Sequence, residues 1–190
     1  MERDLIGLGG AAWIDLANTY IFRDKQRTDL LQEPGFVHTW LDAHGWPAGE
    51  DEAGAATDQL AQLRELCVRA LDELALEMRL SESTMSDLKK EAGRVSLEAR
   101  IDGTTGIPVL TREGRSLMDR VRYGILDSLT ETLGTYPPER IRQCEHKNCI
   151  LHFVDTSKGG RRRWCSMDRC GNRQKAAEFY AKKKDKTGRG

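Results

Sequence analysis

Four cysteines near the C-terminal end of the chain have the spacing of a metal site. They form two C-x4-C pairs separated by fifteen residues, and they are Cys144, Cys149, Cys165 and Cys170. Each pair can aim two sulfurs at one point, and the segment between the pairs can bring them together. Thiolates favour Zn²⁺ over Mg²⁺ or Ca²⁺. The spacing therefore predicts one structural zinc ion per chain, with no open position for a catalytic water.

Two alternatives to this ligand set stay open at this point. His146 lies inside the first cysteine pair and His152 follows it, so either could compete as a zinc ligand. Two disulfides would also use four cysteines, but the chain has five, and its first residues lack the basic and apolar segments of a secretory signal. We therefore expect zinc on the four cysteines, and a cytoplasmic location in which thiols stay reduced.

Basic residues gather at the same end of the chain as the cysteines. Residues 1–139 hold 15 Lys and Arg against 25 Asp and Glu, a net charge of −10, whereas residues 140–190 hold 15 against 5, a net charge of +10. This asymmetry predicts a polyanionic partner. A solvated tail, or docking on the acidic front of the same chain, is the alternative. The candidate nucleic-acid contacts near the cysteines are Lys158, Arg161, Arg162, Arg163, Arg173 and Lys175.

A helix is expected to follow the last cysteine. Gly171 allows a positive φ at the turn, and Asn172 is a suitable N-cap. Arg173 and Lys175 would then lie in the first turns, where the helix dipole disfavours cations, so a phosphate or a base edge would compensate them. Trp164 is expected to pack over the zinc site, with stacking on a base as the alternative.

Residues 1–136 predict a mainly helical domain with one hairpin, so that the whole chain is of the α+β class. Residues 57–78 and 111–133 carry apolar side chains at helical spacing, and Cys67 lies within the first stripe. Residues 95–109 alternate apolar and polar side chains around a turn, which predicts a β-hairpin. Two prolines at 137–138 indicate the boundary to a finger domain of residues 137–190. We expect the two domains to have separate cores.

Polar residues near the N-terminus are candidates for a ligand site. Residues 14–22 are expected to be helical, which would place Asp15 and Asn18 on one side of the helix. Together with Thr19 they would border the pocket of a small-molecule effector. The structural alternative is that Asp15 caps the helix and Asn18 bonds a neighbouring loop.

Two segments of the sequence resemble a known family. Residues 170–173 read CGNR, and with 162–167 (RRWCSM) and 153–157 (FVDTS) they resemble the CGNR zinc finger. Residues 14–19 (IDLANT) are similar to the LDxxNT signature of the ABATE domain that usually precedes this finger. The resemblance covers nearly the whole chain. It implies a bacterial, stress-linked transcription regulator with a DNA-binding C-terminus.

These observations favour a regulator that binds double-stranded DNA, with a front domain that senses a ligand or forms a homodimer. A zinc-stabilised module that binds RNA or a protein is the alternative, because the same charge would serve it. We do not expect an enzyme, since the sequence has no phosphate-binding loop, no HExxH and no ordered Ser, His and Asp set with a supporting motif. We expect no membrane partner, because no apolar run approaches the ~18 residues of a membrane span.

Overall fold

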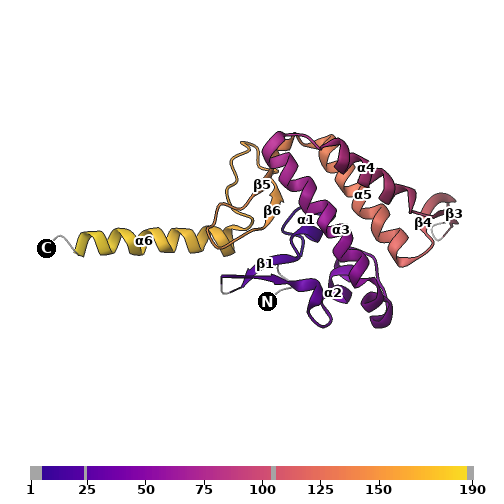
Figure 1. Ribbon diagram of the computed structural model, residues 1–190, viewed down its shortest axis with the longest axis horizontal. Coiled ribbons are helices and arrows are strands. Elements are labelled where there is room, and N and C mark those ends of the chain that lie inside the picture. Colours follow the sequence, from indigo (N-terminus) through magenta and orange to yellow (C-terminus); the bar gives the residue numbers. More distant parts are fainter. Residues whose placement is uncertain (1–5, 24, 104–105, 188–190) are drawn as a thin grey trace.

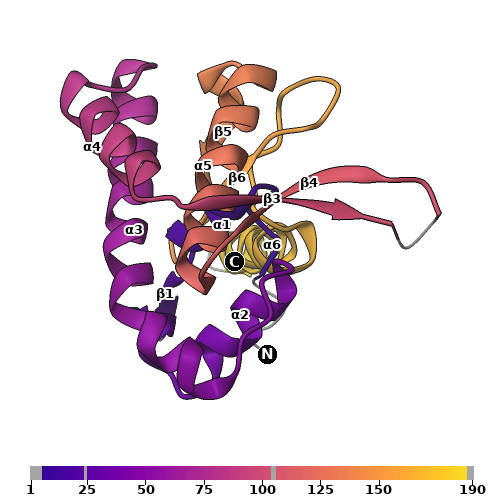
Figure 2. The same cartoon turned by 90° about the vertical axis from the view of Figure 1, so that its right-hand side faces the viewer.

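The computed structural model describes residues 6–23, 25–103 and 106–187, with side chains up to residue 181. In these ranges the chain forms six α-helices and three two-stranded antiparallel sheets, which confirms the α+β class. Most helices pack into one body (Figure 1). Helix α6 extends from one end of this body, and the β3–β4 hairpin lies at the other end and projects outward (Figure 2).

The body is organised around two long helices, α3 (Glu50–Glu77) and α5 (Leu117–Thr135). The apolar stripe of α3, which includes Leu60 and Cys67, is buried against α1, α2 and α5. Helix α4 (Glu82–Gly93) packs on both α3 and α5, and the Ser81 hydroxyl caps it by accepting from the Thr84 amide at 3.2 Å. The predicted mainly helical front is therefore present.

Helix α1 (Ala12–Ala17) is shorter than the helix expected over residues 14–22. It ends at Asn18, and β1 (Tyr20–Arg23) and β2 (Gln26–Asp29) form a hairpin that the sequence interpretation missed. Aromatic and β-branched residues at 20–22 favour a strand, and this local preference prevails over continuation of the helix. A short 3-10 turn (Leu30–Gln32) then leads to α2 (Phe36–Ala43).

A buried arginine holds the β1–β2 hairpin against α3. Arg64 is 1% exposed, and its guanidinium donates to both carboxylate oxygens of Asp29 at 2.5 and 2.7 Å. It also donates to the Thr19 hydroxyl at 3.1 Å and lies over the Tyr20 ring. The two-point geometry suits a planar guanidinium, which explains why a charged residue occupies an apolar stripe.

The predicted hairpin is present as β3 (Leu97–Asp102) and β4 (Val109–Gly114). The expected helical start at residue 111 is wrong, because β4 continues to Gly114 and α5 begins at Leu117. Its base is fixed to α5 at two points. The Asp119 carboxylate accepts from the Ser96 amide at 2.9 Å and from Ser116 in the capping box of α5. Gly114 lies so close to α5 that an added Cβ would stand 2.4 Å from the Arg120 nitrogen.

The C-terminal region begins with a 3-10 turn (Pro138–Arg140) and pairs β5 (Ile141–Gln143) with β6 (His152–Val154). A π-helical turn, η4 (Met167–Gly171), then continues into α6 (Asn172–Thr187). The expectation of separate cores is wrong, because Phe153 and Val154 belong to the same apolar cluster as Trp13 and Ile14. The predicted boundary at residue 137 stays a prediction.

No helix in the part of the chain that the structure describes is long and apolar enough to span a membrane.

Candidate metal centre and basic surface

The four predicted cysteines meet at one point. Among the described residues, Cys144, Cys149, Cys165 and Cys170 form the one cluster that could hold a metal ion, and their sulfurs all lie within 4.8 Å of one another. The Cys165 sulfur is 3.8 Å from that of Cys149 and 3.7 Å from that of Cys170. A tetrahedron with Zn–S bonds of about 2.3 Å has edges of about 3.8 Å. The sulfur spacing fits one structural zinc ion.

Proximity shifts the pKa values of these thiols in opposite directions. Hydrogen bonds from Cys149, Cys165 and Cys170 lower the pKa of Cys144 by stabilising its thiolate. Hydrogen bonds to Cys144 are the largest cause that raises the pKa of Cys149 and of Cys165. A zinc ion among the four sulfurs would favour the thiolate form of all four, because metal binding releases the thiol protons.

Backbone hydrogen bonds position the two cysteine pairs. The first pair lies in the loop between β5 and β6, where the Cys144 amide donates to the Leu151 carbonyl at 2.8 Å and the Cys149 amide to the His146 carbonyl at 2.9 Å. The second pair spans η4, where the Cys170 amide donates to the Ser166 carbonyl at 3.0 Å. His146 and His152 do not belong to the cluster, and the His146 ring accepts from the Asn148 amide at 3.2 Å.

In the CGNR segment, the roles of Gly171 and Asn172 differ from the expected ones. Gly171 does not have a positive φ. A Cβ at this position would instead stand 2.5 Å from the Met167 sulfur and 3.0 Å from the Trp164 ring, so the glycine makes room for side chains beside the site. Asn172 is the first residue of α6, and the cap of the turn before it is Ser166.

A buried carboxylate shapes the loop between the cysteine pairs. Asp155 is 0% exposed and accepts from the Ser157 amide at 3.0 Å, the Ser157 hydroxyl at 2.6 Å and the Arg162 amide at 2.9 Å. Burial raises the pKa of Asp155, but these hydrogen bonds outweigh burial and hold the pKa below its usual value. The carboxylate thus links both ends of the turn that precedes the second cysteine pair.

Arg162, one of the predicted nucleic-acid contacts, is engaged within the finger. Its guanidinium donates to the carbonyls of Trp164, at 2.9 Å, and of Cys165, and it lies 4.4 Å from the Phe153 ring centroid. These contacts tie the arginine-rich segment to β6 and to the third cysteine. In the sequence the three arginines at 161–163 look equivalent. The position of Phe153 in the fold gives Arg162 a contact that marks it as a structural residue.

The other predicted contacts are exposed side chains of the C-terminal region. This set consists of Lys158, Arg161, Arg163, Arg173 and Lys175. Arg163 forms an ion pair with Glu145 at 2.5 Å and remains 58% exposed. Arg173 and Lys175 lie in the first turns of α6, which points away from the body (Figure 1). The lysines from residue 182 onward lie outside the described side chains.

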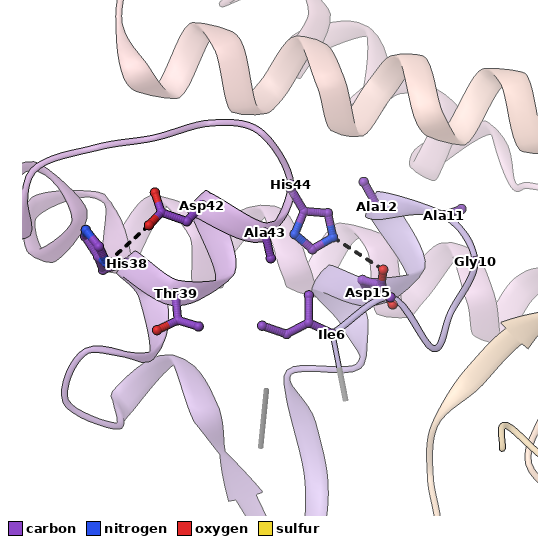
Figure 3. A pocket seen from close by; sticks show the side chains of 11 residues that line it. Ile6, Gly10, Ala11, Ala12, Asp15, His38, Thr39, Asp42, Ala43 and His44 are labelled. Atoms are coloured by element: carbon purple, nitrogen blue, oxygen red, sulfur yellow. Dashed lines mark hydrogen bonds and ion pairs between the residues drawn. The ribbon is translucent and has the colours of Figure 1, made fainter. Parts of the chain in front are cut away.

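Asp15, a predicted ligand residue, lines a cavity of about 830 Å³ between α1 and α2 (Figure 3). One Asp15 oxygen accepts from the Gly9 amide at 2.8 Å, and the other lies 3.3 Å from His44 Nε2. His44 Nδ1 donates to the Trp40 carbonyl at 2.8 Å. Both ring nitrogens of His44 therefore face oxygen atoms, which fixes the orientation of the imidazole beside the cavity. Thr39 and Asp42 also line the cavity.

Asn18 and Thr19 do not line this cavity. The Asn18 side chain donates to the His152 carbonyl at 2.9 Å and accepts from the His152 amide at 2.8 Å, as a neighbouring strand would. The Thr19 hydroxyl donates to the Leu16 carbonyl at 2.8 Å and accepts from Arg64. These two residues connect parts of the fold.

Sequence reasoning missed two residues of these networks. His44 is separated from Asp15 by 29 positions and carries no local signal of that contact. Arg64 could have been found, because it lies one helical turn after Leu60 and one turn before Cys67 in the apolar stripe of α3. A charged residue in such a stripe indicates a buried partner.

Family models match both parts of the chain. The ABATE model, described as "Putative stress-induced transcription regulator", matches residues 10–131, and the CGNR zinc finger model matches residues 140–183. A search of curated proteins gives no match. The second model encloses all four cysteines of the metal centre, and the first covers more than half of the chain. The protein therefore belongs to the ABATE family and carries a CGNR zinc finger at its C-terminal end.

Proposed function

We propose that this protein is a transcription regulator that binds duplex DNA through its zinc finger and α6. The observation that carries this proposal is that five exposed cations flank the clustered cysteines along the chain, namely Lys158, Arg161, Arg163, Arg173 and Lys175. Such cations attract the phosphates of DNA, whatever its base sequence. A cytoplasmic location agrees with the free thiols, which a reducing compartment preserves.

Helix α6 supplies a second argument. Its described side chains are almost all exposed, and it contacts η4 at its start before it extends away from the body (Figure 1). A single helix of 16 residues gains little stability in water without a packing partner. The helix dipole disfavours Arg173 and Lys175 in its first turns, and a DNA phosphate or base edge beside them would reverse this penalty.

The proposed activity is binding and not catalysis. Four thiolates close the shell of a zinc ion and leave no position for an activated water. The metal would therefore hold the loop and α6 in place, and the exposed cations would contact the partner.

Fluorescence anisotropy with a duplex oligonucleotide at several salt concentrations tests the proposal. If about five cations contact phosphates, the logarithm of affinity falls against the logarithm of salt with a slope of about −4.5. Lys158→Gln with Arg161→Gln should reduce the slope to about −2.7, because two contacts are lost. Arg162 is left unchanged, since its removal would damage the finger. Arg79→Gln with Lys89→Gln, two exposed cations of the body, is the matched control.

Two outcomes would contradict DNA binding. One is a salt slope that stays the same in the Lys158 and Arg161 double variant. The other is preference for single-stranded RNA or for an acidic protein over duplex DNA in competition, which would favour the interaction-module alternative.

We also infer that the cavity beside Asp15 holds a small-molecule effector. Its volume of about 830 Å³ and its buried Asp15–His44 pair support this inference. Native mass spectrometry of the purified protein should detect a retained small molecule. Thr39→Trp, which fills the cavity from α2, should lose that molecule, whereas Thr57→Trp on α3 should keep it. Equal retention by both variants would contradict the inference.

A further inference from the structure

The β3–β4 hairpin exposes an apolar face that nothing in the described part of the chain covers. Paired residues of antiparallel strands share a face, and Ile101 lies opposite Leu110 in this hairpin. Both side chains are 65% exposed, and Leu97 and Ala99 continue the same face along β3. Figure 2 shows the hairpin projecting from the helical body. An isolated two-stranded hairpin is marginally stable in water, whereas additional strands stabilise an apolar face.

The outer edge of β3 is open for such additional strands. Strands β3 and β4 form a two-stranded sheet within the described residues, and β4 rather than β3 packs against α5 through Gly114. The last four residues of β3, from Ala99 to Asp102, are exposed. Asp119 attaches the base of the hairpin, next to β3, to the start of α5.

The sequence of β3 is complementary to itself in one antiparallel register. We propose that two copies of this chain form a dimer by pairing their β3 strands about a two-fold axis beside Ala99. In this register, Leu97 lies opposite the partner's Ile101. Glu98 lies opposite the partner's Arg100, and the symmetry repeats both pairs. Cross-strand pairs of opposite charge and of apolar side chains stabilise antiparallel sheets.

Neighbouring registers are unfavourable, so the pairing is specific. A shift by one residue places apolar side chains opposite charged ones. A shift by two residues places Arg100 opposite the partner's Arg100 in one direction, and Glu98 opposite the partner's Glu98 in the other. Within one chain Arg100 already lies between Glu98 and Glu113, with a 2.9 Å distance to the latter. The dimer would extend this alternating network across the axis.

The outer edge of β4 lacks the opposite-charge pairs that β3 offers, because its Arg112 and Glu113 are adjacent and cannot lie opposite each other about an axis beside a β4 residue. Centred on Thr111, it would place Leu110 opposite the partner's Arg112. Pro108, directly before β4, also removes a backbone donor near that end of the edge. The open edge of β3 is therefore the better site for a second copy, because an isologous interface uses one self-complementary surface twice.

The dimer goes beyond the proposed DNA binding and does not depend on it. Helix α6 and the hairpin lie at opposite ends of the molecule (Figure 1), so pairing of the hairpins would leave both basic helices accessible. Loss of DNA binding in the Lys158 and Arg161 double variant should leave dimerisation unchanged. Loss of the dimer should leave the salt dependence of the individual fingers unchanged.

A charge-exchange experiment tests the dimer with zinc-loaded, full-length protein. Sedimentation equilibrium of the wild type should give twice the 21.4 kDa chain mass. Glu98→Arg alone and Arg100→Glu alone should each raise the dissociation constant about tenfold or more, because every cross-strand charge pair becomes repulsive. A mixture of the two variants should restore the dimer, because positions 98 and 100 are then both basic in one chain and both acidic in the other.

Two further measurements make the result specific. Ile101→Asp should also give monomers, whereas Leu76→Asp, at an exposed apolar position of α3, should not. Hydrogen exchange should show slow amide exchange along β3 in the wild type and fast exchange in the Arg100→Glu variant. Circular dichroism identifies a variant that fails to fold, and a misfolded chain would not recover a dimer on mixing. Wild-type monomers at all concentrations, single variants that stay dimeric, or no recovery in the mixture would each overturn the proposal.

Discussion

The helical body buries long apolar stripes, whereas the zinc finger buries few apolar side chains. In the body, α1, α3 and α5 contribute residues such as Trp13, Leu60 and Ile125 to an extended core. In the finger, Leu151, Phe153 and Val154 join that core, and the remaining order comes from four sulfurs and the Asp155 carboxylate. Stability is thus distributed over many contacts in the body and concentrated in a few residues in the finger.

Removal of zinc should produce the largest difference between the two regions. Structural zinc contributes ~10–16 kcal/mol in finger peptides, so chelation or Cys165→Ser should unfold the finger. The body should stay helical with a lower melting temperature, because it loses the packing of Phe153 and Val154 on α1. Far-UV circular dichroism and zinc analysis measure both effects.

Thiol labelling of the same samples distinguishes the two kinds of cysteine. After chelation the four finger cysteines should react with iodoacetamide, and Cys67 should not, because burial raises its pKa to about 12. Cys67→Ala serves as the control and should keep one zinc per chain. Reaction of Cys67 at the same rate as the others would show that the body unfolds together with the finger.

Asp155→Asn should have the next largest effect. The amide group cannot accept from the Arg162 amide and from both Ser157 donors as the carboxylate does, so a fully buried position loses part of its hydrogen bonding. We expect a loss of ~2–4 kcal/mol in the free energy of unfolding of the finger, measured by the urea dependence of hydrogen exchange at the finger amides. Asp168→Asn, an exposed carboxylate of η4, should change little. Equal losses of stability in the two variants would contradict the conclusion that the hydrogen bonds of Asp155 stabilise this turn.

Asn18→Ala should weaken the contact between the two regions. The variant leaves the His152 amide and carbonyl without their side-chain partner, at a cost of ~1–3 kcal/mol. Hydrogen exchange at the His152 amide should accelerate, while the helices of the body stay protected. Asn18→Asp keeps one acceptor but faces the His152 carbonyl with a second oxygen, so it should not restore the contact. Full recovery by Asp would contradict the two-bond geometry.

Asp119→Asn tests the corresponding carboxylate of the body and should have the smallest effect. Hydrogen bonds from the Ser96 amide, and from Ser116, hold the pKa of Asp119 below its usual value although burial opposes them. A depressed folded-state pKa stabilises the protein above the unfolded value of about 3.9, and this stabilisation is lost as the pH falls through the folded value. Urea unfolding should show a difference of ~1 kcal/mol between wild type and variant at about pH 7, and this difference should shrink as the pH falls below about 3.9. A difference independent of pH would contradict this assignment.

The parts of this molecule that follow from short-range spacing could be predicted. The cysteine pairs, the stripe of α3 and the alternation of β3 are all readable over a few residues. Most of β4 was not, because residues from 111 onward were expected to be helical. The four clustered cysteines were predictable to the residue.

Contacts between distant segments were not predictable in the same way. Asn18 binds His152 across 134 positions, and Asp15 meets His44 across 29. The sequence left two roles open for Asn18, beside a pocket or bonded to a neighbouring loop, and the structure shows a backbone contact of the second kind. No single-sequence pattern identifies His152 as its partner, so the link between body and finger was not predictable. The role of Arg162 was hidden for the same reason, because it depends on where Phe153 lies.

The Asn18–His152 contact also constrains when the protein can finish folding. During synthesis α1 emerges from the ribosome early, but β6, which satisfies Asn18 and bonds the Gly9 carbonyl through the Val154 amide, is made more than a hundred residues later. Contacts of such long sequence separation form late and slow the folding reaction. Because β6 lies between the two cysteine pairs, we expect zinc binding and the docking of Gly9 and Asn18 on β6 to occur together, late in folding.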